Sequence, residues 1–464
     1  MARAHRIVDW DPEDTVAWEA GNKAIARRNL ICSVIADHAA FSIWSIWSVL
    51  VLFMPQSVYG FSASDKFLLG AVATLVGGCV RVPYTLGIAR FGGRTWTMLA
   101  TLVLLIPTVG TIVLLAHPGL PLWPYLVCAG LTGLGGGNYT ASLTNINAFY
   151  PQRRKGWALA VDAGGANLGV AGIQLVGLLV LATAGNRAPY WVSAIYLVFL
   201  ALAALTAALL MDNLEHSIEL ADYRSLLGEF HTWVITVLYI GAFGSFIGLV
   251  FAFGRVLYIN FLGGGHSSAV ASLHVAQVAF LGPLLGSLAR VYGGRLSDRV
   301  GGSRVALVVF GGMSVTTGLL AAISVHGERT PGPAGAAAMA GYVSGFVVLF
   351  VLSGMGSGAI FKMIPSIFHA RSRALDLGEA ERRHWARAMS GALLGFAGAV
   401  GAFGGVAINL GLRQSYASTG EATSALWLFL AYYLMAAVLT WQVYVRRPAA
   451  GRATAEADST AALL

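Results

Sequence analysis

The sequence has few charged residues. Only 11% of its 464 residues are Asp, Glu, Lys or Arg, whereas a soluble domain carries about 25%. Hydrophobic residues make up 57% of the chain, and the mean hydropathy is +0.70. One bilayer-spanning helix needs about 20 largely apolar residues, so the chain has room for about a dozen such helices. The composition excludes a soluble enzyme and predicts a polytopic α-helical membrane protein.

Cysteine is scarce as well, and no cofactor motif is present. The three cysteines (Cys32, Cys79 and Cys128) lie in apolar runs without CxxC spacing, so no disulfide framework or metal site is expected. The ten histidines form no HxxxH or HExxH pair, and the sequence contains no Gly-x-Ser-x-Gly. We therefore predict no enzymatic activity, no metal and no cofactor.

Twelve apolar runs are separated by charged or Pro/Gly-rich segments, in two sets of six. An acidic stretch, 212–229, divides the sets and is interpreted as a cytoplasmic linker. We expect an all-α fold of twelve transmembrane helices in two pseudo-symmetric six-helix halves. The predicted organisation begins with an N-terminal arm (1–29) and a first six-helix half (30–211). The linker (212–229) joins it to a second six-helix half (230–445), which a tail (446–464) follows.

Basic residues are distributed unequally between the two sets of alternate loops. One set, with both chain ends, holds 22 Lys and Arg, and the other holds four: Lys66, Arg187, Arg329 and Arg413. By the positive-inside rule, both termini are predicted to be cytoplasmic and the protein to lie in the cell (inner) membrane. The net charge of +9 is thus mostly a topology signal, and we expect no nucleic-acid partner.

An internal repeat relates the two halves. Arg81 lies nine residues before Arg90-Phe-Gly-Gly, and Arg290 lies nine residues before Arg299-Val-Gly-Gly. The glycine cluster at 133–137 has a counterpart at 354–358. Parallel repeats of this kind are typical of the two halves of a major facilitator transporter.

A few charges lie inside the apolar runs, where they face a cavity or the bundle interior by default. Arg81 and Arg290 are each nine residues from a boundary arginine, which is about 14 Å, close to the middle of the membrane. Two guanidinium groups that meet there need an anion between them, and the planar arginine fork binds planar oxyanions well. We therefore predict that they form an anion site, although anchoring of a gate to helix-end carbonyls is the alternative.

Asp37, His38 and Lys362 are the other candidates inside the runs. The Asp37–His38 pair is a candidate acceptor for a coupling proton, whereas a buried Asp37–Lys362 ion pair would be purely structural. Asp162 is expected to bridge to cytoplasmic arginines. Three aromatic residues at the level of the site either cover the anion or belong to the core: Tyr139, Tyr239 and Phe243.

Several segments together resemble the NarK-type nitrate/nitrite transporter family of the major facilitator superfamily. They are Trp10-Asp-Pro-Glu-Asp14, Arg28-Asn-Leu30, Arg81-Val-Pro-Tyr84, Phe91-Gly-Gly-Arg94, Phe243-Gly-Ser-Phe-Ile-Gly248, Gly294-Arg-Leu-Ser-Asp298-Arg299 and Gly354-Met-Gly-Ser-Gly358. Two glycine-rich stretches resemble the nitrate signatures of the family, with their glycines at Gly164, Gly165, Gly169, Gly395, Gly398 and Gly401. The resemblance covers nearly the full chain.

The resemblance implies alternating access, with nitrate and nitrite as substrates, a functional monomer and no cofactor. It implies substrate binding by Arg81, Arg290, Tyr139, Asn167, Tyr239 and Phe243, with Tyr139 in place of the phenylalanine usual in the family. The loop that contains Asp298 and Arg299 is implied to be a gate.

The coupling mechanism has two alternatives within this family, nitrate:proton symport and nitrate/nitrite exchange. Asp37, His38 and Lys362 stand at positions that exchangers fill with uncharged residues, which favours proton coupling. A transporter for another small anion, an anion channel and a nitrate sensor are the rival hypotheses. Six-plus-six symmetry with charges in mid-membrane argues against an open pore, and the short arm and tail offer no signalling domain.

Overall fold

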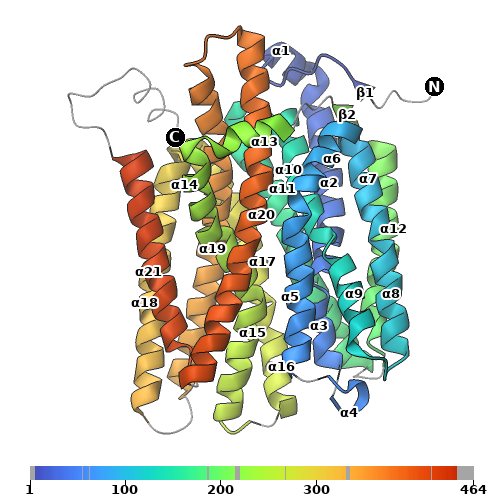
Figure 1. The fold of residues 1–464 in the computed structure, drawn as a ribbon, viewed down its shortest axis with the longest axis vertical. Helices are drawn as coiled ribbons and strands as arrows, with labels where there is room; N and C mark the ends of the chain where they lie inside the picture. The colour runs from blue at the N-terminus through green and yellow to red at the C-terminus, as the bar shows by residue number, and fades with distance from the viewer. Residues whose placement is uncertain are drawn as a thin grey trace.

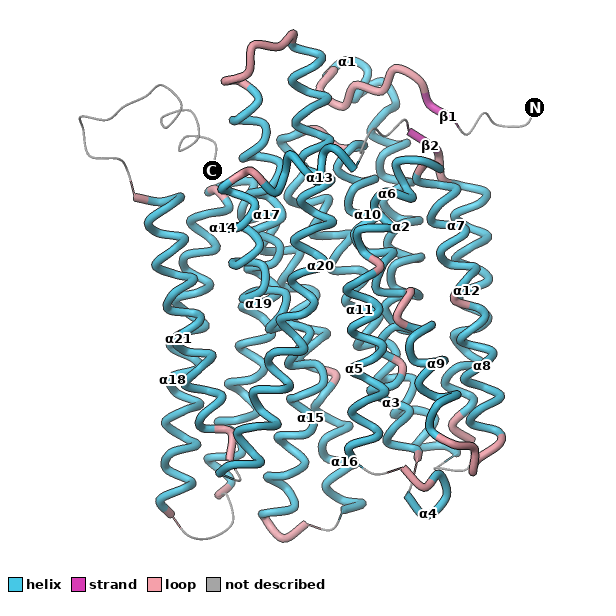
Figure 2. Tube along the Cα trace, viewed as in Figure 1, coloured by secondary structure: helices cyan, strands magenta, loops and turns pink. Residues whose placement is uncertain are grey.

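The computed structural model describes residues 6–54, 56–61, 63–184, 188–214, 220–266, 268–330, 335–419 and 421–446. Within these ranges the chain is almost entirely helical (Figure 1). Figure 2 shows long helical columns with most loops at the two ends of the molecule, and short breaks inside some columns. This is the all-α architecture that the composition predicts.

The N-terminal half contains six columns, several of which are broken into two helices. They are α2 (Lys23–Ser45) with α3 (Trp47–Leu50), α5 (Ala63–Cys79) with α6 (Arg81–Phe91), α7 (Gly93–Val103) with α8 (Leu105–Ala116), α9 (Leu122–Thr132) with α10 (Gly135–Phe149), α11 (Lys155–Ala184) and α12 (Tyr190–Leu210).

The C-terminal half repeats the pattern with six further columns. They are α14 (Phe230–Tyr239), joined by a π-helical turn (Ile240–Gly244) to α15 (Ser245–Gly263), α16 (Ser268–Ala279) with α17 (Leu281–Val300), α18 (Gly302–Arg329), α19 (Ala336–Ser372), α20 (Glu379–Thr419) and α21 (Thr423–Thr440), which a π-helical turn (Trp441–Val445) extends.

Eight helices in the described ranges are long and apolar enough to span a membrane, or nine when the bent pair α5–α6 is taken as one span. The remaining three columns are interrupted or polar. Asp37 and His38 lie on α2, a break separates α9 from α10, and Arg290 lies with three further charges on α17. Polar groups inside a membrane protein concentrate where they line the bundle interior, and the polar residues of α2 and α17 include the candidate site residues Asp37, His38 and Arg290.

The internal repeat is visible in the backbone. Gly92 and Gly301 have φ angles of +82° and +94°, a left-handed conformation that favours glycine, and each ends the helix that carries a site arginine. The next residues, Gly93 and Gly302, begin α7 and α18. The two halves thus turn between their second and third columns in the same way.

The N-terminal segment and the chain between the halves meet at one end of the bundle, the upper end in Figure 1, here named the terminal side. Strand β1 (Arg6–Ile7) pairs in parallel with β2 (Asn213–Leu214). Arg28 forms an ion pair with Asp212. The predicted linker also contains a short helix, α13 (Leu220–Leu227), whereas Glu215 and Glu219 lie outside the described residues.

Candidate functional site

Arg81 begins helix α6, directly after a 42° bend from α5, and its side chain has no exposed surface. The bend turns the guanidinium group into the centre of the bundle. Its Nε donates a hydrogen bond to the carbonyl oxygen of Gly136 on α10 at 3.1 Å. Its Nη1 donates to the carbonyl oxygen of Gly398 on α20, in the opposite half. Arg81 therefore joins the two halves.

Arg290 lies on α17 and is equally buried. Its Nη2 donates to the hydroxyl of Tyr239, on α14 of the same half, at 2.8 Å. The same nitrogen donates to the hydroxyl of Tyr139, on α10 of the opposite half. Each of the two arginines thus donates to one acceptor in its own half and to one in the opposite half.

Aromatic rings lie against both guanidinium groups. The ring of Phe243 is 4.9 Å from the guanidinium carbon of Arg81 and 5.5 Å from that of Arg290. Phe243 stacks on Tyr139 and on Tyr239, with ring centroids 5.5 and 5.1 Å apart. Tyr139 and Phe243 therefore contact both arginines, and Tyr239 contacts Arg290. Cation–π attraction stabilises the charges in the absence of an anion.

Sequence reasoning missed two further rings. Phe361 lies 4.6 Å from the guanidinium carbon of Arg290, and Trp44 lies 5.4 Å from that of Arg81. Both stand on columns rich in aromatic residues, so their position gave no distinguishing signal in the sequence.

Several hydrogen-bond donors of the two arginines have no partner. Nη2 of Arg81 and both Nε and Nη1 of Arg290 are buried and have no partner among the described residues. Neither arginine forms an ion pair with a carboxylate in that part of the chain, and the two positive charges repel each other. Buried donors and unpaired charges are costly. A small anion between the two guanidinium groups would accept hydrogen bonds from these donors and would neutralise the unpaired positive charge.

Asn167 is fully buried on α11, and neither its amide nitrogen nor its oxygen has a partner in the described residues. No hydrogen bond there joins it to the arginines. It therefore offers a polar amide to the bundle interior without being part of the arginine cluster.

The signature glycines permit close helix contacts. A Cβ at Gly398 would lie 2.5 Å from Thr140, and one at Gly401 would lie 2.7 Å from the ring of Tyr239. Gly164 packs against the backbone of Ser287 across the halves, whereas Gly165 and Gly169 pack against α2. Gly395 lies on the same helix as Gly398, α20. The two glycine stretches thus bring α11 and α20 against their neighbours at the level of the site.

Asp37 and Asp162 belong to a second cluster of buried polar side chains. Oδ1 of Asp37 accepts a hydrogen bond from Asn138 at 2.7 Å, and Oδ2 of Asp162 accepts one from Ser142 at 2.7 Å. Ser142 also interacts with Asp37, and the two carboxyl groups interact electrostatically. Asp162 is in addition attracted by Arg290. The expectation that Asp162 bridges to arginines at the cytoplasmic boundary is therefore wrong.

Asp37, His38 and Lys362 do not form one cluster. His38 packs edge-on against Phe199 of α12, with ring centroids 5.5 Å apart. Lys362 forms an ion pair with Asp298 at 3.2 Å and donates to the carbonyl oxygen of Gln152 at 2.7 Å. The alternative interpretation, a buried Asp37–Lys362 ion pair, is therefore wrong. Lys362 lies beside Asp298 on the terminal side and not beside Asp37.

Asp298 contacts the opposite half at the terminal side of the bundle. It lies near the end of α17, and its carboxylate accepts hydrogen bonds from the backbone N–H groups of Gly156 and Trp157 at 3.2 and 2.7 Å. These groups belong to the first turn of α11 in the opposite half, where the helix dipole favours a negative charge. The neighbouring Arg299 is exposed. Asp298 thus joins the halves, whereas Arg299 lies outside this contact.

Comparisons with known proteins agree with this architecture. The family model described as Major Facilitator Superfamily matches residues 36–378. A proton:xylose symporter, XylE, superposes with a TM-score of 0.65 at 14% identity, with 92% of this chain and 97% of that chain covered. The E. coli fucose:proton symporter FucP superposes with a TM-score of 0.61 at 11% identity, with 90% of this chain and 100% of that chain covered. The predicted fold of twelve transmembrane helices in two six-helix halves is confirmed.

Sequence relatives are more specific. The chain is 34% identical over 468 residues to the nitrate/nitrite transporter NarU of Salmonella typhimurium, with 95% of this chain and 96% of the relative covered. It is 30% identical over 467 residues to a probable nitrate/nitrite antiporter, NarK2, of Thermus thermophilus, with 97% and 98% covered. These relatives are named as transporters, in accord with the prediction that the chain is not an enzyme. The protein is a multi-pass membrane transporter and belongs to the NarK-type nitrate/nitrite transporter family of the Major Facilitator Superfamily.

Proposed function

We propose that this protein moves nitrate, and also nitrite, across the inner membrane by alternating access, with the anion bound between Arg81 and Arg290. The observation that carries the proposal is the pair of buried arginines with unpartnered donors, one from each half, enclosed by stacked rings. A planar oxyanion accepts several hydrogen bonds from such donors. The names of the relatives support the same substrates.

The anion contributes to the movement itself. Without it, the two guanidinium charges repel each other across the interface between the halves. An anion bound between them turns this repulsion into attraction, so it stabilises the arrangement in which the halves close around the site. A ligand that binds one arrangement more tightly shifts the equilibrium toward it. The terminal side, where Asp298 contacts the opposite half, is the cytoplasmic side in this proposal.

The arrangement of carboxyl groups favours nitrate:proton symport. Two buried carboxylates near each other repel, and this repulsion is relieved when one of them binds a proton. Ser142 donates its only hydrogen to Asp162, so its oxygen remains able to accept a hydrogen bond from a protonated Asp37. Oδ2 of Asp37 and Oδ1 of Asp162 have no partner in the described part of the chain. Asp37, rather than His38 or Lys362, is the proposed proton acceptor.

Asp162 links the proton to the anion. It is attracted by Arg290, which also faces the anion site. When an anion neutralises Arg290, this attraction weakens and proton binding by the Asp37–Asp162 pair becomes more favourable. Anion and proton then bind together, as symport requires.

Transport by the purified protein in liposomes tests both the proposed substrate and the proposed coupling to protons. Vesicles are loaded with nitrite or with an inert buffer, and nitrate entry is followed together with an internal pH dye. Nitrate entry into nitrite-free vesicles with internal acidification is the expected result. Entry that requires internal nitrite and leaves the internal pH unchanged would show exchange, and the carboxyl pair would then be structural. Absence of nitrate entry in both cases would contradict the substrate and point to another anion.

A further inference from the structure

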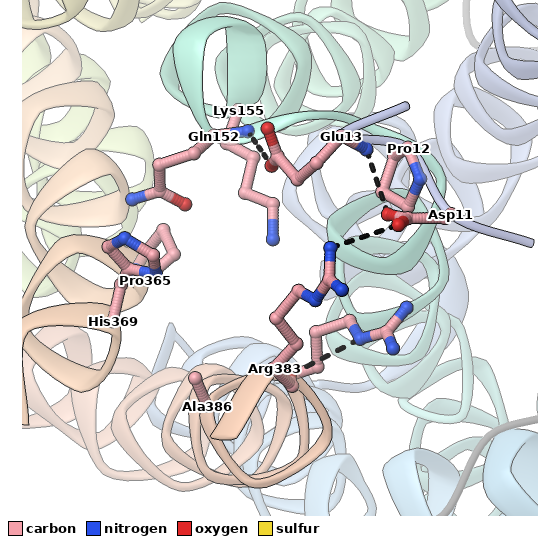
Figure 3. Close-up of a pocket in the computed structure, with 10 residues that line it drawn as sticks. Asp11, Pro12, Glu13, Gln152, Lys155, Pro365, His369, Arg383 and Ala386 are labelled. Atoms are coloured by element: carbon pink, nitrogen blue, oxygen red, sulfur yellow. Dashed lines mark hydrogen bonds and ion pairs between the residues drawn. The ribbon is translucent and has the colours of Figure 1, made fainter. Parts of the chain in front are cut away.

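A pocket on the terminal side lies apart from the arginine site (Figure 3). It is partly open to solvent. Lys155 from the start of α11 lines it from the N-terminal half, and His369, Arg383 and Arg387 line it from the C-terminal half. Asp11 and Glu13 of the N-terminal arm complete it. Three parts of the chain that are distant in sequence therefore build one pocket.

Lys155 is the distinctive residue of this pocket. Only 6% of its surface is exposed, and its ammonium group has no hydrogen bond or ion pair among the described residues. Figure 3 shows the side chain pointing into the middle of the pocket. Arg387 and Lys362 repel its charge, and only Glu13 attracts it. The side chain of Lys155 is largely buried while its ammonium group faces the pocket without a partner in the described residues, so its position points to a ligand.

The acidic residues of the pocket are already occupied. Asp11 forms an ion pair with Arg383 at 3.0 Å. Glu13 accepts a hydrogen bond from the backbone N–H of Gln152 at 2.7 Å. Both contacts fasten the arm to the two halves, so neither carboxylate is held against Lys155. Arg387 uses its Nε on the carbonyl oxygen of Arg383, at 3.3 Å. The pocket therefore presents positive charge that its own carboxylates do not neutralise.

We propose that this pocket is a second anion site, which takes a small monovalent oxyanion such as nitrate or nitrite from the compartment on the terminal side. Lys155 supplies the buried charge and Arg387 a second cation on the facing helix. The size of the charge excess, about one unit when His369 is neutral, suits a monovalent rather than a divalent anion.

The site has a consequence for the transport cycle. Its residues come from both halves and from the arm, so it has this shape only while the terminal side is closed. An anion bound there stabilises the closed arrangement and delays opening toward that side. The second site thus makes uptake sensitive to the anion already accumulated.

Thiosulfonate modification of a cysteine in the pocket, which forms a mixed disulfide and releases a sulfinate, tests this proposal. Ala386 lines the pocket, and Ala386→Cys is made together with Cys79→Ser, which removes the exposed native cysteine. The rate of reaction with a small anionic thiosulfonate is measured with nitrate, nitrite or gluconate at constant ionic strength. Nitrate or nitrite at about ten times its Kd should slow the reaction roughly tenfold, as mass action requires, and gluconate should not.

Two variants test whether Lys155 is responsible for the protection of the cysteine by nitrate or nitrite. Lys155→Gln should abolish this protection, and Lys23→Gln, at an exposed lysine on the same side, should preserve it. If Lys155→Gln does not fold, Lys155→Arg should keep the protection because the charge remains, and its loss there would overturn the proposal. Equal protection in Lys155→Gln would overturn it as well.

Arg81→Lys separates the two sites. The second site does not depend on the proposed arginine site, so nitrate should still protect the cysteine in this variant. Loss of protection in Arg81→Lys would show that the effect arises from the central site and would overturn the proposal. Protection in the protein with Arg81 intact, together with no nitrate entry into liposomes, would support the second site and contradict the proposed function.

Discussion

The hydroxyl groups of Tyr139 and Tyr239 lie 2.9 Å apart, although the two residues come from opposite halves of the molecule. Both hydroxyls accept from the same nitrogen of Arg290. The position of the guanidinium group therefore depends on both halves at once. A relative movement of the halves must break one of these contacts, which couples the geometry of the anion site to the conformation of the protein.

Tyr239→Phe should weaken nitrate binding. A hydrogen bond to a charged group contributes about 1.5–3 kcal/mol, and Tyr139 retains part of this, so we expect roughly a tenfold rise in the KM for nitrate uptake. Tyr433→Phe is the matched control because its hydroxyl is also buried but contacts Ser245 instead. Unchanged uptake kinetics in Tyr239→Phe would show that the hydroxyl does not position Arg290.

Arg81→Lys and Arg290→Lys should each abolish nitrate uptake. Lysine keeps the charge but cannot form the planar donor fork, and it cannot reach two acceptors as arginine does. Uptake of labelled nitrate into proteoliposomes is the measurement. Arg94→Lys is the control, since Arg94 donates to the carbonyl oxygen of Ala208 away from the site. Normal uptake in either site variant would refute the arginine clamp.

Asp37→Asn should retain nitrate/nitrite exchange but lose proton-driven accumulation. The asparagine can still accept from Asn138 but cannot bind the coupling proton. Nitrate accumulation under an imposed pH gradient, compared with counterflow in its absence, is the measurement. His38→Gln should accumulate nitrate normally because His38 faces Phe199. Accumulation by Asp37→Asn at the wild-type level would make Asp37 a packing residue.

Asp298→Asn should favour opening on the terminal side. It removes the ion pair with Lys362 and weakens the contact with α11, a loss of about 1–2 kcal/mol, which changes the ratio of closed to open protein by roughly 5–30-fold. Distances between spin labels at the exposed Arg153 and Glu381 should report a larger open population. Arg299→Gln, one residue further on, should leave the distribution unchanged. An unaltered distribution in Asp298→Asn would contradict its role as a gate.

Gly164→Ala should slow transport without unfolding the protein. The added Cβ would lie 2.9 Å from the carbonyl oxygen of Ser287, across the halves, so α11 and α17 could no longer approach as closely. Gly311→Ala is the control because nothing lies within 4 Å of its Cβ position. Uptake rate and thermal stability are measured in both. Equal uptake rates would show that this close contact does not limit the cycle.

The architecture could be predicted from the sequence because the spacing of apolar runs and the positions of charged residues indicate where the helices lie. Apolar runs define the columns, and the repeat placed Arg81 and Arg290 at the same depth, where both are buried beside one aromatic cluster. Lys362 shows where the argument fails. The sequence does not say which neighbouring helix faces Lys362, since that depends on how the helices pack. The alternative ion pair with Asp37 was therefore wrong, and the contact with Asp298 was not predicted.

The polar group around Asp162 could not be predicted for a similar reason. Ser142, Asn138 and the two aspartates come from three different columns, and the direction of each side chain depends on how those columns rotate against one another. Short polar residues such as serine are common in membrane helices and give no individual signal. The pocket around Lys155 was missed because the counting of charged residues placed that lysine among the loop residues.

Each of the two arginines has one of its hydrogen-bond acceptors in the opposite half, and this also affects how the two halves come together during folding. In an isolated N-terminal half, Arg81 would lack the Gly398 carbonyl, and in an isolated C-terminal half Arg290 would lack Tyr139. Each half alone would expose an arginine, deprived of one of its acceptors, on an unpaired face. Such a half leaves a buried charge without one of its acceptors, so we expect neither half to fold stably without the other.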